Sequence, residues 1–502
     1  MKRSIIIIGL LLGTYGLFAQ YAEDALRYSL QYYQGSARFM AVGGAFGGLG
    51  GDFSVLSTNP GGIGVFRNSE TILTPSVTNR KVTSIYDFDG TLRDDNSVVF
   101  ALNNFGYVNA KRLGRGGKGW KYFQYAIGMN RLANYNTSIY MQGENQSSSR
   151  IDTYIDDAVD FLNDGGTYDE LLYHDPFYVG PAWETYLLDT VSDENFTYLI
   201  SPVPAGGLMQ TQRIETRGSN NEWFGSIGAN FNDILYVGAT LGFPYIRYYR
   251  DSYYAETDVE NSETFDNWSV SESLVTKGMG INFKIGAIVR PIDWIRIGAA
   301  FHTPSYYWSL TDSWYTYTTS DVYAYSLDEW VVSDYKSVIG EYNYKLTTPM
   351  RFIGDLAFII KKFGFLSAEY EYVNYSNAKF KANDYSFATE NENIKSYYTS
   401  AHNLRAGAEW RVSSLSLRAG YALYSSPYKN NLNDGARQSY SGGLGYRGKS
   451  FAIDFAYVYS KMNEDYYMYI YSDPNTGDDI SPKVTNELAE SSFILSFKYY
   501  FN

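Results

Sequence analysis

Residues 443–450 read GLGYRGKS and match the phosphate-binding pattern G-x-x-x-x-G-K-S. Phosphate binding by this motif requires a strand, a loop whose backbone N–H groups hold the phosphates, and a helix that starts at once. After Ser450, however, apolar residues recur at every second position, which is typical of a strand. We therefore interpret the motif as a hairpin turn and predict no nucleotide site.

The chain has no cysteine and three histidines, His174, His302 and His402. Without cysteine, disulfide bonds and thiolate metal sites are excluded. His174 and His302 could each serve as a haem ligand or transfer a proton, but a hydrogen-bonded structural histidine is the favoured interpretation. The acidic loop 472–479 lacks the ligand spacing of a calcium loop. No Ser/His/Asp constellation can be assembled, so we predict no enzyme, no cofactor and no metal site.

The first residues have the layout of a secretory signal peptide. A basic start, Met1-Lys2-Arg3, precedes a short apolar run, and the small residue Ala19 stands at the expected cleavage point. The apolar run is too short for a membrane-spanning helix, so residues 1–19 are predicted to direct export. The net charge of −13 argues against nucleic acid as a partner, because phosphate binding needs a basic surface.

Strict alternation of apolar and polar residues indicates strands along most of the remaining chain. The final segment places Phe493, Phe497 and Phe501 on one parity, and Ser492 and Ser496 on the other. A period of two gives a strand one apolar face. The apolar faces end repeatedly in tyrosine, and 51 of the 502 residues are tyrosine. Aromatic side chains are selected where an apolar band meets water, so the pattern favours a membrane barrel over a soluble sandwich.

Short turns alternate with long polar connections, which is the layout of outer-membrane β-barrels. Counting from Thr71, with residues 208–231 taken as one strand, gives about fourteen strands, an even number as such barrels require. The sequence therefore predicts an all-β fold, a transmembrane antiparallel β-barrel over residues 69–502 with a long extracellular loop at 143–207. We expect a monomer in the outer membrane of a Gram-negative cell, inserted by the barrel-assembly machinery.

The long loop contains an amphipathic helix. Ile151, Ile155 and Leu162 recur at helical spacing, with aspartates on the opposite face. Exposed apolar clusters usually cover or bind something. Two interpretations are open, because the loop could bury its own apolar face or could form a docking site for an apolar ligand. The candidate docking residues are Ile151, Ile155, Val159, Leu162, Leu171, Leu172, Phe177, Trp183 and Leu187.

A glycine-rich stretch precedes the first strand. Residues 35–62 read GSARFMAVGGAFGGLGGDFSVLSTNPGG and lack the flanking strand and helix of a phosphate loop. A backbone that crosses a crowded interior needs residues without side chains. Pro60 then holds Asn59 extended just before the first strand. The motifs GSAR, MAVGGAF and SVLSTNP resemble the plug region of the FadL/TodX family of outer-membrane channels for hydrophobic compounds.

The resemblance implies that residues 20–68 form a plug, or hatch, folded inside the barrel and anchored to its wall. The candidate plug residues are Arg38, Gly43, Gly44, Asn59, Pro60 and Gly61, although Gly61 stands where the family motif usually has alanine. It also implies passive uptake of a hydrophobic small molecule or lipid, such as a long-chain fatty acid. The molecule would enter an apolar lumenal pocket and leave sideways through a kink in the third strand.

In this chain the alternation of the third strand breaks at residues 130–134. The candidate positions for a lateral opening are Gly128, Asn130, Arg131 and Asn134. Charged residues predicted to face the lumen could orient the head group of an amphiphile, or could be paired struts that fill the barrel. These residues are Arg296, His302, Glu369, Arg405, Glu409 and Arg418.

Two other functions remain open from the sequence. Some barrels that this chain resembles, such as PorV, act as docking or assembly partners in protein secretion, which large aromatic-rich loops would suit. A haem-binding surface receptor is the third hypothesis, although three histidines support it poorly.

Overall fold

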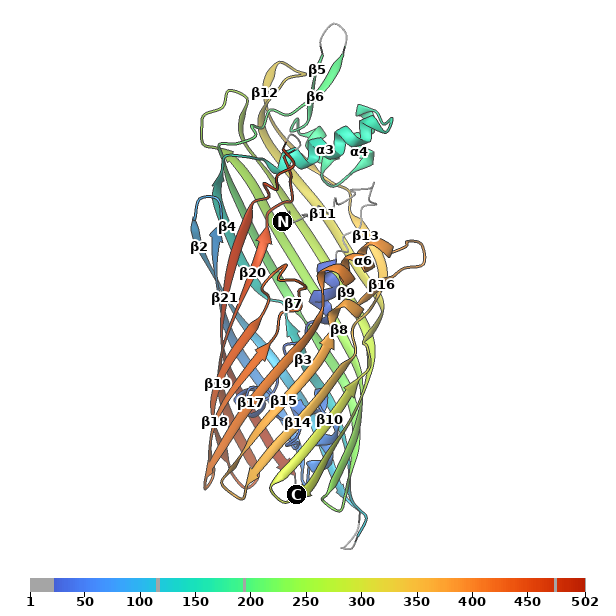
Figure 1. Cartoon of the computed structure of the whole chain (residues 1–502), viewed down its shortest axis with the longest axis vertical. Coiled ribbons are helices and arrows are strands. Elements are labelled where there is room, and N and C mark those ends of the chain that lie inside the picture. The colour runs from blue at the N-terminus through green and yellow to red at the C-terminus, as the bar shows by residue number, and fades with distance from the viewer. Residues whose placement is uncertain (1–21, 114–117, 193–195, 474–475, 502) are drawn as a thin grey trace, which may run out of the picture.

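The computed structural model describes residues 22–113, 118–192, 196–473 and 476–501, so the predicted signal peptide lies outside the described residues. The chain forms a tall antiparallel β-barrel (Figure 1). Within the described residues the wall has 14 strands, and pairing of β1 (Ser69–Tyr86) with β21 (Lys483–Phe501) closes it. The predicted barrel of about fourteen strands is confirmed.

Most wall strands in the described residues are continuous: besides β1 and β21, they are β2 (Leu92–Arg112), β7 (Leu208–Phe231), β8 (Leu235–Asp258), β9 (Phe265–Ile292), β17 (Ser400–Val412), β18 (Leu415–Tyr424), β19 (Arg437–Arg447) and β20 (Phe451–Tyr467). The others are interrupted: β3 (Trp120–Asn134) with β4 (Thr137–Asn145), β10 (Ile295–His302) with β11 (Tyr306–Ala324), β12 (Glu329–Lys336) with β13 (Gly340–Thr347) and β14 (Arg351–Ile360), and β15 (Gly364–Asn374) with β16 (Lys379–Lys381).

Proline explains two of the interruptions. Pro304 separates β10 from β11, and Pro349 separates β13 from β14. A proline cannot donate an N–H group to the ladder, so pairing stops beside it. The segment 208–231 is one strand, as the strand count assumed, because β7 pairs with β8 over its whole length.

Alternation along each strand separates an outer from an inner face. On β21, Phe493 and Tyr499 are 48% and 53% exposed on the outside, whereas Ile494 and Ser496 are buried inside. Exposed apolar residues on the outer face are what a lipid bilayer requires of a barrel. Residues 443–447 of the motif end β19 and residues 448–450 form the turn into β20, so a hairpin stands there, as the alternation predicted.

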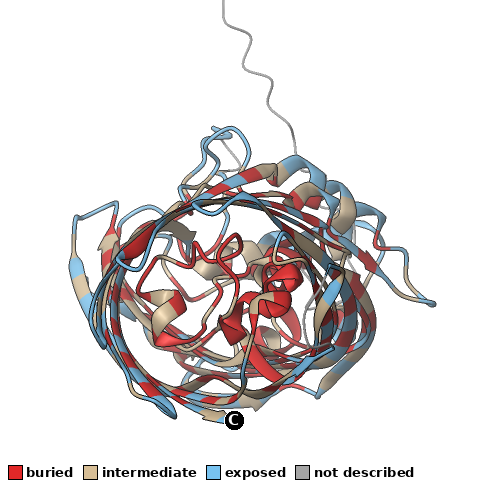
Figure 2. Cartoon of the chain, turned by 90° about the horizontal axis from the view of Figure 1, so that it is seen from below, coloured by how far each residue is buried: buried red, intermediate tan, exposed pale blue. Residues whose placement is uncertain are grey.

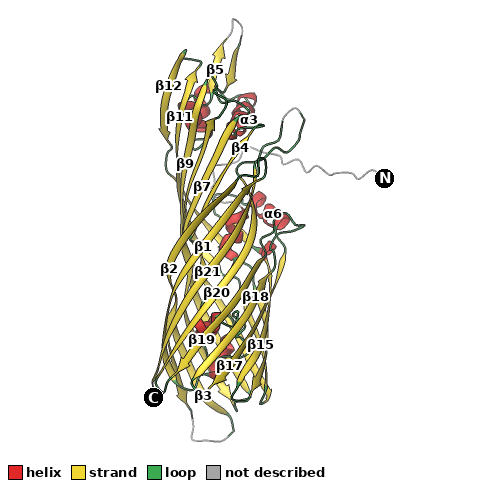
Figure 3. Ribbon diagram, turned by 90° about the vertical axis from the view of Figure 1, so that its left-hand side faces the viewer, coloured by secondary structure: helices red, strands yellow, loops and turns green. Residues whose placement is uncertain are grey.

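The wall is much taller on one side. Strands β7, β8 and β9 have 24, 24 and 28 residues, whereas β15, β17 and β18 have 11, 13 and 10. The tall side carries the long loop (Figure 3). That loop folds into α3 (Arg150–Asn163), η3 (Tyr168–Glu170), α4 (Leu171–His174), α5 (Val179–Glu184) and the hairpin of β5 (Asp189–Ser192) and β6 (Thr197–Ile200).

Two further groups of helices complete the chain. Helix α6 (Ala388–Tyr397) and the turn η4 (Tyr375–Asn377) follow β15 on the shorter side (Figure 1). Residues 22–66, here called the N-terminal segment, lie inside the barrel (Figure 2). They form α1 (Ala22–Ser29), α2 (Ala37–Met40), η1 (Phe53–Ser57) and η2 (Pro60–Val65). None of the helices in the described residues is long and apolar enough to cross a bilayer.

Candidate functional site

The N-terminal segment packs into the core of the barrel. Phe53, Leu56 and Ile63 of this segment share one buried cluster with Val108 of β2 and Phe224 of β7. The ring centroids of Phe53 and Phe224 lie 5.3 Å apart. Burial of a large apolar side chain stabilises by roughly 1.5–3 kcal/mol, so contacts of this kind hold the segment against the inner wall.

Polar contacts tie the same segment to strands on the opposite side of the barrel. Arg38 donates from Nε to Glu409 of β17 over 3.0 Å. Asn59 donates from Nδ2 to Asp355 of β14 over 2.9 Å, and its Oδ1 accepts the N–H of Gly61 at 3.0 Å. Pro60 follows as the first residue of η2, where its missing N–H group is not needed.

Two glycines of the segment permit close approach to the wall. Gly43 has φ +66°, and a Cβ there would lie 2.7 Å from the carbonyl oxygen of Tyr421 on β18. A Cβ on Gly61 would lie 2.8 Å from the Cα of Ala287 on β9. Gly44 also has a positive φ of +80°. The glycine-rich composition therefore reflects backbone-to-backbone packing inside the barrel.

Gly43→Ala tests this packing. We expect it to destabilise the protein by about 1–3 kcal/mol, because alanine is strained in the left-handed backbone conformation of residue 43 and its Cβ would clash with the wall. Limited proteolysis should then cut the N-terminal segment faster than in the wild type. Gly225→Ala is the matched control, since no atom lies within 4 Å of a Cβ placed on that wall glycine. Equal protease resistance of the two variants would contradict the packing.

The lumenal charges predicted from the sequence are brought together in ion pairs. Arg405 binds Glu369 and also Glu371, the latter at 2.8 Å. Glu371 binds a second cation, Arg351, at 2.6 Å. All four side chains are buried, and buried charges are tolerated only when paired.

A second ion-pair group lies on the neighbouring strands. Arg418 binds Glu409 at 2.6 Å and Asp454 at 2.7 Å. The remaining two candidates contact the backbone of the N-terminal segment: Nε2 of His302 lies 2.7 Å from the carbonyl oxygen of Thr58, and Arg296 donates to the carbonyl of Leu49. Each of the six candidates therefore contacts another charged residue or the N-terminal segment inside the barrel.

Sequence reasoning missed further buried ion pairs, among them Lys498 with Asp52 and Lys284 with Glu222. Lys284 of β9 binds Glu222 of β7, and their side chains are 2% and 0% exposed. Glu222 also accepts from Ser57 at 3.3 Å and from Asn282 at 3.1 Å. Lys284 and Glu222 both lie on the inward parity of their strands, which was the signal that could have identified them.

The remaining histidines make ordinary contacts. Nε2 of His174 lies 3.2 Å from Asp157, and its ring stacks on Phe161. Nδ1 of His402 lies 2.7 Å from the hydroxyl of Tyr370. In the part of the chain that the structure describes, no group of three or more His, Cys, Asp or Glu side chains is placed to hold a metal ion.

A cavity of about 50 Å³ lies between the N-terminal segment and the wall formed by β1 and β17 to β21. This is room for a few water molecules. Aromatic and basic side chains meet there, with Arg437 over the ring of Tyr32 at 4.6 Å and Arg405 over that of Tyr33 at 5.1 Å. Its wall is otherwise rich in small hydroxyl groups: Thr78, Ser439, Ser441, Ser460 and Ser492.

The wall is incomplete between β2 and the interrupted strand β3–β4. β2 pairs with β3 only from Asn104 to Arg112, and beyond Asn104 it pairs with β1 alone. β4 pairs with β7. No ladder joins β2 to β4 in the described residues. We call this gap, between residues 92–103 and 131–145, the seam.

Side chains bridge the seam where the backbone does not. Ser138 of β4 donates to Asp95 of β2 over 2.5 Å. Arg93 of β2 donates from Nε to Gln142 of β4 over 3.0 Å. These contacts hold the two edges beside each other without the ladder of a continuous sheet.

The N-terminal segment binds both edges where the seam begins. The N–H of Gln34 donates to the carbonyl of Arg131 over 3.1 Å. On the other edge, Nδ2 of Asn103 donates to the carbonyl of Gly35 over 3.5 Å. A movement of the N-terminal segment would therefore break hydrogen bonds to both edges of the seam.

The four residues suggested for a lateral opening lie along the start of this gap. Gly128 is still paired on both sides, and Asn130 is the last residue of β3 paired with β2. The register with β7 shifts directly after Arg131. Asn134 ends β3, and its Oδ1 accepts the N–H of Asn136 at 3.1 Å. The break in alternation thus coincides with a real irregularity in the wall.

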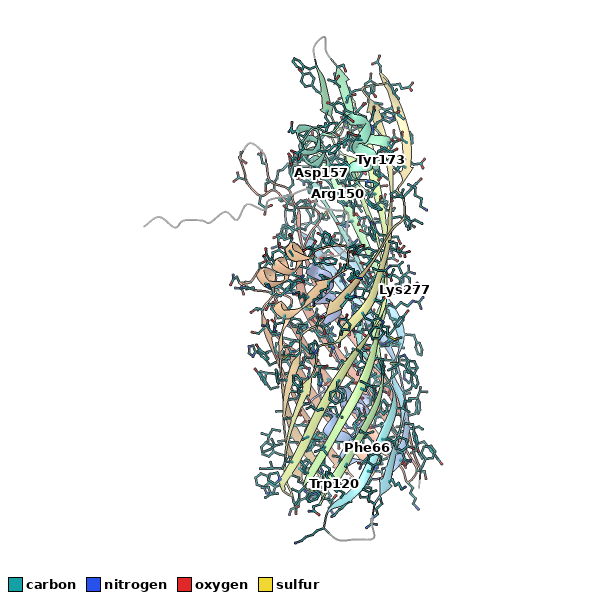
Figure 4. All side chains as sticks on the ribbon, turned by 90° about the vertical axis from the view of Figure 1, so that its right-hand side faces the viewer. Phe66, Trp120, Arg150, Asp157, Tyr173 and Lys277 are labelled. Atoms are coloured by element: carbon teal, nitrogen blue, oxygen red, sulfur yellow. The ribbon has the colours of Figure 1, made fainter. Side chains whose placement is uncertain are left out.

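The long loop packs against the tall strands, and its described residues 148–192 and 196–203 are here called the cap (Figure 4). Buried Glu256 of β8 accepts from Ser149 at 2.5 Å and from the N–H of Arg150 at 2.9 Å. The indole of Trp268 donates to the same carboxylate over 2.7 Å. These bonds fix the first turn of α3 against the wall, and burial raises the pKa of Asp152 in that turn to about 6.

Most candidate docking residues of the cap face inward. Ile151, Leu171, Phe177 and Leu187 are buried, and Val159 is exposed. The remaining candidates are partly buried: Ile155, Leu162, Leu172 and Trp183. The cap therefore buries much of its own apolar face, which was one of the two interpretations left open.

Ile151→Asp tests whether this buried face holds the cap. Ile151 is 1% exposed, and losing its packing costs about 2 kcal/mol or more, so a protease should cut the cap over tenfold faster. Val159→Asp, on the same helix at 38% exposure, should leave the cutting rate unchanged. Unchanged resistance of the Ile151→Asp variant would show that the cap is held by other contacts.

Comparison with known proteins addresses the fold. No protein-family model matches the chain, and a search of curated proteins found no match. Among solved structures, a FadL homologue of Pseudomonas aeruginosa is similar, with a TM-score of 0.54 and 13% identity, over 94% of this chain and 100% of that chain. The chain has the FadL/TodX channel fold.

A second solved structure agrees with the FadL/TodX fold. The toluene transporter TodX of Pseudomonas putida gives a TM-score of 0.52 at 9% identity, over 94% of this chain and 100% of that chain. At such identities the shared property is the fold. The motifs in residues 35–62 thus occur in a chain that shares the FadL/TodX fold over nearly its whole length.

Proposed function

We propose that this barrel is an outer-membrane channel for the passive uptake of hydrophobic compounds, such as long-chain fatty acids. It acts as a monomer in a Gram-negative cell, after export and insertion by the barrel-assembly machinery. The fold shared with a FadL homologue and a toluene transporter supports this function. The apolar outer face supports a location in a bilayer.

The seam is the observation that carries the proposal. A barrel wall that only conducts along its axis does not need residues 92–103 of β2 to be paired on one side alone. Val98 and Phe100, 66% and 74% exposed, lie on the outer face beside the unpaired edge. An apolar molecule that passes between the edges would therefore meet apolar side chains and then lipid.

The N-terminal segment acts as the plug in this proposal. The cavity beside it has room for a few water molecules, so an apolar ligand requires the segment to shift. Because Gln34 and Asn103 link the segment to the two edges, such a shift loosens the seam at the same time. The cap covers the loop side of the barrel, where a ligand first arrives.

In this proposal the apolar part of a ligand packs against the aromatic rings of the cavity, whose lining also contains hydroxyl groups. Arg405 and Arg437 face it but are already bound to carboxylates, Arg437 to Glu490 at 3.1 Å. Neither cation is available to hold a head group. Ligand contacts are therefore assigned to Tyr32 and Tyr33.

Extraction of the purified protein followed by mass spectrometry tests the proposal. A bound fatty acid or hydrocarbon is the expected result. An empty barrel that co-purifies with another protein would favour the assembly role, and a Soret band would favour haem binding.

A further inference from the structure

We propose that the outer surface of β8 and β9 binds the phosphate head group of an anionic membrane lipid. Arg247 of β8 and Lys277 of β9 are direct cross-strand partners, and both are exposed. Like charges directly opposite each other destabilise a sheet. In the described residues neither cation belongs to an ion pair. An anion bound between them removes the repulsion.

Tyr249 contacts both cations of this pair and holds them beside each other. Arg247 donates from Nε to the Tyr249 hydroxyl over 2.6 Å. The Tyr249 ring lies 5.0 Å from the guanidinium carbon of Arg247 and 5.8 Å from Nζ of Lys277. Directly paired residues have Cα atoms about 4.5–5.5 Å apart, so one phosphate can contact both cations.

The position of the pair selects a lipid over a free anion. Lys277 projects outward from the barrel wall (Figure 4). The next outward residues along β9 are Met279, Ile281 and Phe283, all exposed and apolar. In the other direction the outward residues are Val275, Ser273 and Ser271, so one further apolar residue precedes the serines. The cations therefore lie near the end of the apolar surface, so acyl chains can lie along Met279, Ile281 and Phe283 while the head group contacts the cations.

A second like-charged pair occurs on the same outer surface. Lys345 of β13 is the direct partner of Lys381 of β16. Nζ of Lys345 donates to the side chain of Asn383 over 3.4 Å, and in the described residues neither lysine belongs to an ion pair. Two such pairs on a chain of net charge −13 are consistent with selection for an anionic ligand.

The test uses the full chain and native mass spectrometry in a neutral detergent. Phosphatidylglycerol, phosphatidylcholine and inorganic phosphate are the probes. We expect the wild type to bind phosphatidylglycerol more tightly than phosphatidylcholine. In the variant Arg247→Gln/Lys277→Gln this preference should fall about fivefold for each cation removed. Lys461→Gln removes an exposed cation of β20 that faces the neutral Gln438, and should leave the preference within about twofold.

Three results would overturn the assignment: an unchanged preference in the double variant, an equal loss in the control, or inorganic phosphate that binds as tightly as the lipid. The inference rests on the proposed membrane location, which is tested separately. A barrel that inserts into phosphatidylcholine vesicles but shows no lipid preference overturns only the lipid site. A barrel that inserts into no vesicle overturns the proposed channel as well.

Discussion

A disulfide across the seam abolishes uptake of an apolar compound. The variant is Asp95→Cys/Ser138→Cys. In the wild type the Ser138 hydroxyl donates to the Asp95 carboxylate over 2.5 Å across the gap. The wild-type chain has no cysteine, so the introduced pair is the only one that can oxidise. Because the bond prevents the edges of β2 and β4 from separating, oleate uptake into vesicles that contain the oxidised barrel should fall to the rate of protein-free vesicles. A thiol reductant should restore it.

The matched control places a disulfide where the wall is already continuous. Ser269 of β9 and Thr319 of β11 are register partners whose hydroxyl oxygens lie 2.8 Å apart. Oxidation of Ser269→Cys/Thr319→Cys should leave uptake unchanged. Full uptake by the oxidised seam variant would exclude the seam as the route and favour passage along the barrel axis.

Arg405→Met costs about 3–5 kcal/mol of the free energy of unfolding, measured by urea unfolding in phospholipid vesicles. Arg405 is 1% exposed and neutralises Glu369, while it shares Glu371 with Arg351. Its removal leaves a buried carboxylate without a cation. Adding Glu369→Gln to the same variant should recover part of the loss, because the uncompensated charge is then gone.

Arg217→Met is the control for the loss of an arginine on the surface. Arg217 pairs with Asp251, and these side chains are 63% and 45% exposed. Exposed pairs contribute about 0–1 kcal/mol, so this variant should unfold nearly as the wild type does. A similar small cost for Arg405→Met would mean that the interior is wet enough to solvate Glu369.

The strands and the cap helix could be predicted because their signals are local. Alternation in residues 492–501 gives the outer and inner faces of β21 without knowledge of any partner strand. The spacing of Ile151, Ile155 and Leu162 likewise gives α3. The direction of a lumenal side chain, such as that of Arg405 or Glu369, follows from the same parity.

Partners and register could not be predicted in this way. Glu222 and Lys284 have the correct parity, but 62 residues separate them and alternation does not identify their pairing. A register shift between Thr74 and Pro75 in the pairing of β1 with β2 leaves Asn103 outside that ladder, at the position where the seam begins. Such long-range register is set by closure of the whole barrel.

Uptake into vesicles is the most direct measurement of the central claim. The full chain is inserted into phosphatidylcholine vesicles, and the rates at which oleate and glucose reach the vesicle interior are compared with those of protein-free vesicles. The account predicts that the barrel accelerates oleate and leaves glucose unchanged. An oleate rate equal to that of protein-free vesicles, from a barrel shown to be inserted and folded, would contradict it.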